Sequence, residues 1–261
     1  MDKTHFNIGF FDSGVGGISV LREAIALMPN ENYIYFGDSL NAPYGIKSPE
    51  EVKRLSFNVI DKLISMDVKA IVVACNTATS IVIDDLREKY MDLPIIGIEP
   101  ALKPAVENYG DGIIVIMATP MTLAENKFSI LRERYSKTAH IIPMPCDGLV
   151  EIIESGNTRG SIIEDYLNDK FKDVSKEQVS AVVLGCTHYP FIKEALLNVI
   201  NKDVSIIDGS KGTVRQLKRM LKAKNLLNNS ESKGSIKILN SKNEERLIAL
   251  SYELLQGDKN S

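Results

Sequence analysis

Cysteine and histidine are scarce in this chain of 261 residues, which contains three of each. An odd number of widely spaced cysteines, without a signal-peptide pattern, does not indicate a disulfide framework. No apolar run is long enough to span a bilayer, and the net charge of −3 shows no excess of basic residues. Binding to membranes or nucleic acid is therefore not expected. We expect a cytoplasmic globular protein in which each cysteine and histidine is a candidate functional residue.

Short apolar segments alternate with helix-like patterns along the whole chain. Several of these segments are apolar at every position, as in strands that are covered on both faces. Repeated strand–helix units predict an α/β fold with mostly parallel sheets and helices on both faces. The predicted strands are 8–11, 33–36, 70–74, 95–98, 113–118, 141–142, 181–184, 205–207 and 236–239.

The clearest helix start lies after the second predicted strand. Ser48 has the character of an N-cap, Pro49 suits the first helical position, and Glu51 stands three residues after the cap. The residues that follow predict a buried helical stripe formed by Val52, Leu55, Val59 and Leu63.

Two segments of the chain resemble each other. Residues 71–77 and 182–188 each contain an apolar strand, a small residue, a cysteine and then polar residues, and the cysteines Cys75 and Cys186 lie 111 positions apart. Asp12 and Thr119, which end two other strands, lie 107 positions apart. The similar offsets predict two related α/β domains, which we expect to face each other. We place one at 1–98 plus 211–261 and the other at 99–210.

Candidate functional residues follow the ends of these strands. Parallel α/β sheets bind ligands outside the carboxyl ends of their strands, where Asp12, Cys75, Thr119 and Cys186 are expected. A single cysteine after a strand is usually a small buried hydrophobe. Two cysteines at matching positions of a repeat instead favour a shared function. Cys146 is not in such a setting, and we expect it to be structural.

A glycine-rich turn spans residues 12–17. It does not match a dinucleotide fingerprint, because Ser19 occupies the position of the third glycine, and it does not match the Gly-Lys-Ser/Thr ending of a phosphate loop. Two interpretations remain open. The turn offers backbone N–H groups to a small anion such as a carboxylate, or its glycines serve turn geometry alone.

Two further motifs contain potential ligand-binding groups. Pro43-Tyr44-Gly45 shapes a turn that could present the Tyr44 phenol and backbone amides to a ligand, although such a segment is more often an ordinary surface loop. His188 lies two residues after Cys186, close enough for both side chains to share one pocket.

Four motifs occur in order along the chain: Asp-Ser-Gly-Val-Gly-Gly at 12–17, Pro-Tyr-Gly at 43–45, Ala-Cys-Asn-Thr-Ala at 74–78 and Gly-Cys-Thr-His-Tyr-Pro at 185–190. Together, over about residues 7–255, they resemble the glutamate racemase family. The resemblance implies two α/β domains with glutamate bound between them, no cofactor and no metal. It also implies a supply of D-glutamate for peptidoglycan, a homodimer and, in some members, regulation by a cell-wall precursor.

Racemisation needs a base on each side of Cα, because one face loses a proton and the other gains one. A thiol suits this role, since its reference pKa of about 8.5 lies near working pH. By the resemblance, Cys75 takes the proton from D-glutamate with help from Asp12, and Cys186 takes it from L-glutamate with help from His188. Glu154 resembles a family acid near the second cysteine. The residues implied to bind substrate are Asp12, Ser13, Pro43, Tyr44, Gly45, Asn76, Thr77, Thr119, Thr122, Thr187 and His188.

The sequence departs from the family pattern at three positions. Glu125 replaces a small hydroxyl residue, Phe128 replaces a tyrosine, and Asp147 replaces a proline. These departures put helix packing and fine substrate contacts in doubt more than the reaction type.

Several alternatives remain open at this point. Racemases of aspartate or hydantoins share the two-cysteine logic and differ in the side-chain pocket. A zinc site formed by Cys75, Cys186 and His188 would be unusual because paired cysteines are missing. A redox pair would more often be C-x-x-C, and a binding protein with the same domains would not exchange the Cα proton.

Overall fold

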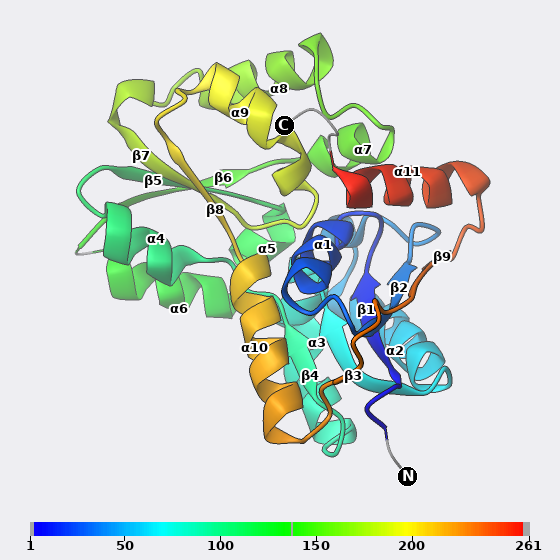
Figure 1. The fold of residues 1–261 in the computed structure, drawn as a ribbon. Helices are drawn as coiled ribbons and strands as arrows, with labels where there is room; N and C mark the ends of the chain where they lie inside the picture. The colour runs from blue at the N-terminus through cyan, green and yellow to red at the C-terminus, as the bar shows by residue number, and fades with distance from the viewer. Residues whose placement is uncertain (1–2, 137, 258–261) are drawn as a thin grey trace. The chain divides into compact units, whose positions relative to one another are not determined.

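The computed structural model describes residues 3–136 and 138–257. The chain divides into two compact units, Met1–Ile98 with Ser210–Ser261 and Glu99–Gly209. Each unit contains one sheet in which every strand pair is parallel (Figure 1). In the part of the chain that is described, no helix combines the length and apolar character needed to cross a membrane.

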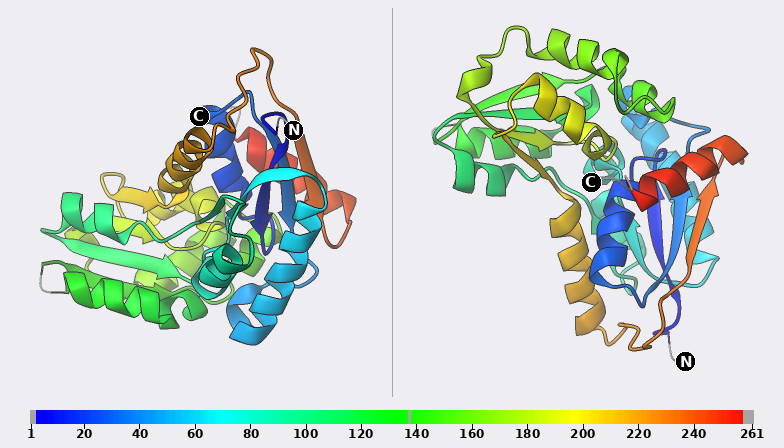
Figure 2. Two further views of the ribbon diagram at one scale, coloured as in Figure 1. Left: turned by 90° about the horizontal axis from the view of Figure 1, so that it is seen from below. Right: turned by 45° about the horizontal axis from the view of Figure 1, so that its top comes forward.

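The first unit is built on a five-stranded sheet of order β4-β3-β1-β2-β9. Helices from different parts of the chain cover it: α1 packs against α10 and α11, whereas α2 packs against α3 (Figure 2). The strands are β1 (Asn7–Asp12), β2 (Asn32–Gly37), β3 (Val68–Val73), β4 (Ile95–Gly97) and β9 (Ile236–Asn240). The helices are α1 (Ile18–Leu27), the short η1 (Tyr44–Ile46), α2 (Pro49–Ile64), α3 (Asn76–Lys89), α10 (Ser210–Ala223) and α11 (Glu245–Gln256).

Helix α2 begins where its sequence predicts. The Ser48 side chain accepts a hydrogen bond of 3.2 Å from the Glu51 amide, and Pro49 occupies the first helical position. The four residues of the predicted stripe are all buried. The capping and periodicity predictions are therefore confirmed.

The second unit is built on a four-stranded sheet of order β6-β5-β7-β8. Two apolar clusters lie in this unit, one formed largely with α7, α8 and α9 and the other with α4 and α6. The strands are β5 (Ile113–Ala118), β6 (His140–Pro145), β7 (Val179–Leu184) and β8 (Ser205–Asp208). The helices are α4 (Leu102–Tyr109), α5 (Pro120–Ala124), α6 (Asn126–Tyr135), α7 (Leu149–Glu154), α8 (Ser161–Phe171), η2 (Lys176–Gln178), η3 (Tyr189–Ile192) and α9 (Lys193–Val199).

The two sheets share one topology. The order β4-β3-β1-β2 in the first unit matches β8-β7-β5-β6 in the second. Even an irregularity recurs, because the register shifts between Asn7 and Ile8 where β1 meets β3, and between Ile113 and Ile114 where β5 meets β7. The internal repeat inferred from the two cysteine segments is thus a repeat of structure.

All nine predicted strands are present, but β6 extends further than its apolar residues indicate. It runs through Pro143 and Pro145, which a strand tolerates at a sheet edge because it pairs on one side alone. Cys146 consequently follows the end of a strand. The matching strand of the first unit, β2, is followed by Asp38 rather than a cysteine, so Cys146 has no counterpart in the repeat.

Candidate active site

The two cysteines of the repeat lie at equivalent positions in their sheets. The chain leaves β1 toward one edge of the first sheet and reaches β3 and β4 on the other side, so the connections diverge between β1 and β3. Asp12 ends β1 and Cys75 follows β3. In the second sheet the same divergence lies between β5, followed by Thr119, and β7, followed by Cys186. Such switch points are where open α/β sheets bind ligands.

Cys75 is the N-cap of helix α3. Its Sγ accepts a hydrogen bond of 3.4 Å from the Ala78 amide and lies 3.5 Å from the Ser13 hydroxyl. The positive end of the helix dipole and the amide donor both stabilise negative charge on this sulfur. Only 6% of the residue is exposed, so the sulfur is held in a defined position.

Asp12 lies in the turn that precedes α1. The carboxylate is fully buried and accepts a hydrogen bond of 2.8 Å from the Gly14 amide. Gly17 packs so closely here that a Cβ would come within 2.7 Å of the Asp12 Cβ and 2.9 Å of the Ala74 Cβ. This glycine therefore permits the close approach of the turn to the ends of β1 and β3.

The Tyr44 phenol is engaged within the protein. Its hydroxyl donates a hydrogen bond of 2.7 Å to Asp38 Oδ2, and the Asn41 amide donates to both oxygens of the same carboxylate at 3.1 and 3.0 Å. Burial, followed by the charge and hydrogen bond of Asp38, raises the pKa of Tyr44 above its ordinary range, and the charges of Cys75 and Asp12 add to this effect. Tyr44 thus lies near Cys75 and Asp12, but its hydroxyl hydrogen is donated to Asp38 and not to a ligand.

Asp38 was missed in the sequence analysis. It follows β2 directly, as Asp12 ends β1, and its backbone amide donates a 2.9 Å hydrogen bond to the Asp12 carbonyl. Its position directly after a strand could have identified it, because the same criterion selected Asp12, Cys75, Thr119 and Cys186 as candidates.

Asn76 and Thr77 form the first residues of α3. Both are buried, and Asn76 Oδ1 has no hydrogen-bond partner within the protein. A buried acceptor without a donor is unfavourable by about 1–3 kcal/mol. This oxygen is therefore available to a donor from a bound molecule.

In the second unit, three predicted residues form a chain of polar contacts. Cys186 Sγ lies 3.7 Å from His188 Nδ1, and His188 Nε2 lies 2.8 Å from Glu154 Oε1. Burial by itself lowers the pKa of His188. The hydrogen bonds and charges of Cys186 and Glu154 outweigh burial and raise that pKa well above its ordinary value. The histidine therefore favours the imidazolium form between two groups that can be negative.

The predicted threonines of this unit are buried beside the same strand ends. Thr119 caps α5, and its Oγ1 lies 3.2 Å from the Thr122 amide and 2.9 Å from the Thr122 hydroxyl. Thr187 is also buried, between Cys186 and His188 in the chain. These hydroxyls supply short, neutral hydrogen-bonding groups.

Cys146 differs from the other two cysteines in its surroundings. It shares the large apolar cluster of the second unit with Cys186, but its thiol donates to the Met144 carbonyl at 3.4 Å, whereas Cys186 lies beside His188. Burial raises the pKa of Cys146 to about 12. It therefore remains a thiol at neutral pH, as a structural residue would.

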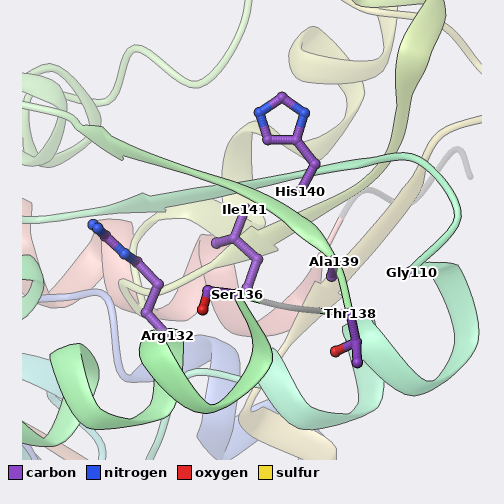
Figure 3. A pocket seen from close by; sticks show the side chains of 7 residues that line it. All are labelled: Gly110, Arg132, Ser136, Thr138, Ala139, His140 and Ile141. Atoms are coloured by element: carbon purple, nitrogen blue, oxygen red, sulfur yellow. The ribbon is translucent and has the colours of Figure 1, made fainter.

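A pocket of about 510 Å³ lies elsewhere on the second unit, where β6 begins. It contains none of the predicted site residues, and its Arg132 and His140 side chains project in different directions (Figure 3). The described residues also contain no group of three His, Cys, Asp or Glu side chains arranged to hold a metal ion. The candidate catalytic groups are therefore those that lie at the two switch points.

A family model described as Asp/Glu/Hydantoin racemase matches residues 18–217. The chain belongs to this racemase family. A glutamate racemase of Clostridium botulinum (strain Alaska E43 / Type E3) is 59% identical over 256 residues, which cover 98% of this chain and 99% of that protein. The resemblance found from the four motifs is thereby confirmed, and the protein is an isomerase.

Solved racemase structures share the fold. The glutamate racemase of Francisella tularensis subsp. tularensis SCHU S4, crystallised with D-glutamate, has a TM-score of 0.83 at 29% identity, over 98% of this chain and 96% of that chain. The Escherichia coli glutamate racemase, crystallised with L-glutamate and the activator UDP-MurNAc-ala, has a TM-score of 0.78 at 32% identity, over 84% and 83%. Two parallel α/β domains are therefore the architecture of this racemase.

The three departures from the racemase pattern lie outside the motifs that contain Cys75 and Cys186. Phe128 packs in the apolar cluster with α4, where a tyrosine hydroxyl would be buried. Glu125 precedes α6, and Asp147 is exposed, with its carbonyl accepting from the Tyr166 hydroxyl at 2.9 Å.

Proposed function

We propose that this racemase interconverts L- and D-glutamate by a two-base mechanism with Cys75 and Cys186. The observation that carries the proposal is the matched position of the two cysteines, each at the switch point of one repeat and each with its own polar partners. The names of the relatives support glutamate as the substrate. In this proposal both thiols act on the same substrate molecule.

Each thiol acts as a base in one direction and as an acid in the other. With L-glutamate, Cys186 as thiolate removes the Cα proton while Cys75 as thiol delivers one to the opposite face, and the roles reverse with D-glutamate. Asp12 assists Cys75, and His188, held by Glu154, assists Cys186. Helix donation to Cys75 favours its thiolate without a metal or an organic cofactor, and His188 lies beside Cys186.

The substrate groups are bound by neutral donors and acceptors. We assign Asn76 Oδ1 to the α-ammonium group, because it is a buried acceptor without a partner. The carboxylates are bound by hydroxyl and backbone N–H groups, whose fixed dipoles stabilise developing charge without reorganisation. These groups come from Ser13, Tyr44, Gly45, Thr77, Thr119, Thr122 and Thr187. Pro43 has no N–H group and contributes by shaping the turn that presents Tyr44 and Gly45. For Tyr44 the contact comes from its backbone, because the phenol hydrogen is bound by Asp38.

The same proposal covers the cellular role. In this proposal, D-glutamate produced in the cytoplasm supplies peptidoglycan synthesis. The chain also forms a homodimer, as the family resemblance implies. A cell-wall precursor is the proposed effector class, since the E. coli relative was crystallised with such an activator. Light scattering of the purified chain tests the dimer, and assays with and without the precursor test regulation.

The experiment that tests the reaction follows the circular dichroism of L-glutamate with purified, metal-free protein and no added cofactor. We expect the signal to decay to zero, and Cys75→Ala and Cys186→Ala each to abolish the decay while keeping the fold. Aspartate and a hydantoin, assayed in parallel, separate the related racemases. Binding of glutamate without decay would contradict the proposal and indicate a binding protein, and loss of activity with a chelator would indicate a metal site.

A further inference from the structure

The loop between β2 and α2 has one buried anchor. From Leu40 to Ser48, all of which the structure describes, Tyr44 is the single buried side chain, at 1% exposure. Leu40 and Ile46 on either side of it are 63% and 76% exposed. The position of Pro43 to Gly45, which we propose to bind substrate, therefore depends on how Tyr44 is held.

The Tyr44 hydroxyl has a carboxylate partner, Asp38, which is itself only 3% exposed. A buried carboxylate is unfavourable unless hydrogen-bond donors surround it, and here Tyr44 and Asn41 supply them. The three residues thus form a closed network inside the loop. The Tyr44 ring also packs against Phe11 of β1, with ring centroids 6.1 Å apart.

Asp38 is in turn fixed to the site by the backbone. Its backbone N–H donates to the Asp12 carbonyl at 2.9 Å, and the backbone N–H of Asn41 donates to the Asp38 carbonyl at 3.0 Å. Asp38 therefore joins two parts of the site: its backbone is bonded to the strand end that contains Asp12, and its carboxylate is bonded to Tyr44 in the loop.

We propose that Asp38 is a positioning residue for substrate binding, which acts through the Tyr44 hydroxyl to hold the Pro43–Gly45 segment in its binding position. This inference rests on the proposed function, since it takes that segment as a substrate contact. Asp38 transfers no proton in this proposal. Its removal should weaken binding of both enantiomers to the same extent, because they share the groups that the loop contacts.

The test compares Asp38→Ala, Tyr44→Phe, the double variant and Asp38→Asn, with KM and kcat measured from both enantiomers. We expect each of the first two to raise KM about 10-fold for L- and D-glutamate with a smaller change in kcat. The double variant should be no worse than the more impaired single variant, because both remove one interaction. Asp38→Asn keeps an oxygen that accepts from Tyr44 and should restore most of the affinity.

The matched control is Asp61→Ala. Asp61 also accepts a hydrogen bond from a tyrosine, Tyr90, but Asp61 is exposed on α2 and Tyr90 is the half-buried C-cap of α3. Its KM should equal that of the wild type. If Asp38→Ala fails to fold, Tyr44→Phe and Asp38→Asn still decide the question, because each changes few atoms.

Three results would overturn the inference: an unchanged KM in both Asp38→Ala and Tyr44→Phe, additive losses in the double variant, or a fall in kcat larger than the rise in KM. The last result would mean that Asp38 acts on the proton transfer itself. Wild-type protein and Cys75→Ala, run in the same assay, distinguish this failure from failure of the proposed function. Racemisation by the former and none by the latter leaves the proposed function standing whatever Asp38 does.

Discussion

The two cysteines at the switch points have unlike partners, although their strands are related by the repeat. Cys75 is stabilised by a helix N-terminus and lies beside Ser13. Cys186 does not cap a long helix and instead lies beside a buried histidine that is held by Glu154. The polar groups that lie beside the two sulfurs are therefore different. The repeat therefore preserves the position of the thiol but not the groups that tune it.

The pKa of His188 makes part of the stability dependent on pH. Because the folded-state pKa lies above its ordinary value, the protonated histidine stabilises the fold. This contribution is complete below the unfolded-state pKa of about 6.5 and is lost as pH rises through the raised folded-state pKa. Glu154→Gln should remove much of it. We expect the difference in unfolding free energy between wild type and Glu154→Gln, measured by urea denaturation, to be largest near the acidic end of this window and to shrink as pH rises.

The structural interpretation of Cys146 predicts that Cys146→Ala racemises glutamate at nearly the wild-type rate. The substitution removes one buried sulfur from the apolar cluster, so the free energy of unfolding should fall by about 1 kcal/mol. Kinetics and thermal unfolding of one preparation measure both effects. Complete loss of activity in a folded variant would show that the cysteines have been misassigned.

At the scale of elements, replacing serine by alanine in helix α2 should change the free energy of unfolding in opposite directions at two positions. Ser48→Ala removes the N-cap and should destabilise the protein by about 1 kcal/mol. Ser56 is fully buried on the same helix, and its hydroxyl has no partner. Ser56→Ala should therefore stabilise by up to about 1 kcal/mol. Equal loss of stability in the two variants, measured by urea denaturation, would contradict this account.

The elements themselves were largely predictable from sequence because their signals are local. Strands buried on both faces are apolar at every position, and α2 carries its own cap and stripe. Strand β6 was underestimated because its second half contains prolines, which an edge position alone permits. Asp38 was missed for a related reason: its role depends on Tyr44, six residues along the chain, and on the fold of the intervening loop.

At the scale of the whole molecule, the repeat gives two units with the same strand order but different continuity in the chain. The second unit, Glu99–Gly209, is one uninterrupted segment with apolar clusters of its own. The first is completed by α10, β9 and α11 from the end of the chain. The two cysteine motifs predicted this repeat from sequence. The polar partners of each cysteine were instead predicted from the family resemblance, because the pattern of residues alone does not indicate them.

This division predicts that a fragment of residues 99–209 folds alone. It should unfold cooperatively in urea and show the circular dichroism of an α/β protein, because its sheet is covered by helices from within the fragment. It should not racemise glutamate, since it lacks Cys75. A fragment that stays unfolded would show that the second unit depends on the first for stability.

The central claim is that two bases act on opposite faces of Cα, and deuterium incorporation tests it most directly. L-glutamate is incubated with the protein in D₂O, and both enantiomers are recovered at an early time and analysed by mass spectrometry. Two bases predict D-glutamate that carries deuterium at Cα, together with remaining L-glutamate that still carries hydrogen. A single base that returns its own proton would instead give D-glutamate that keeps its original hydrogen, and this result would contradict the account.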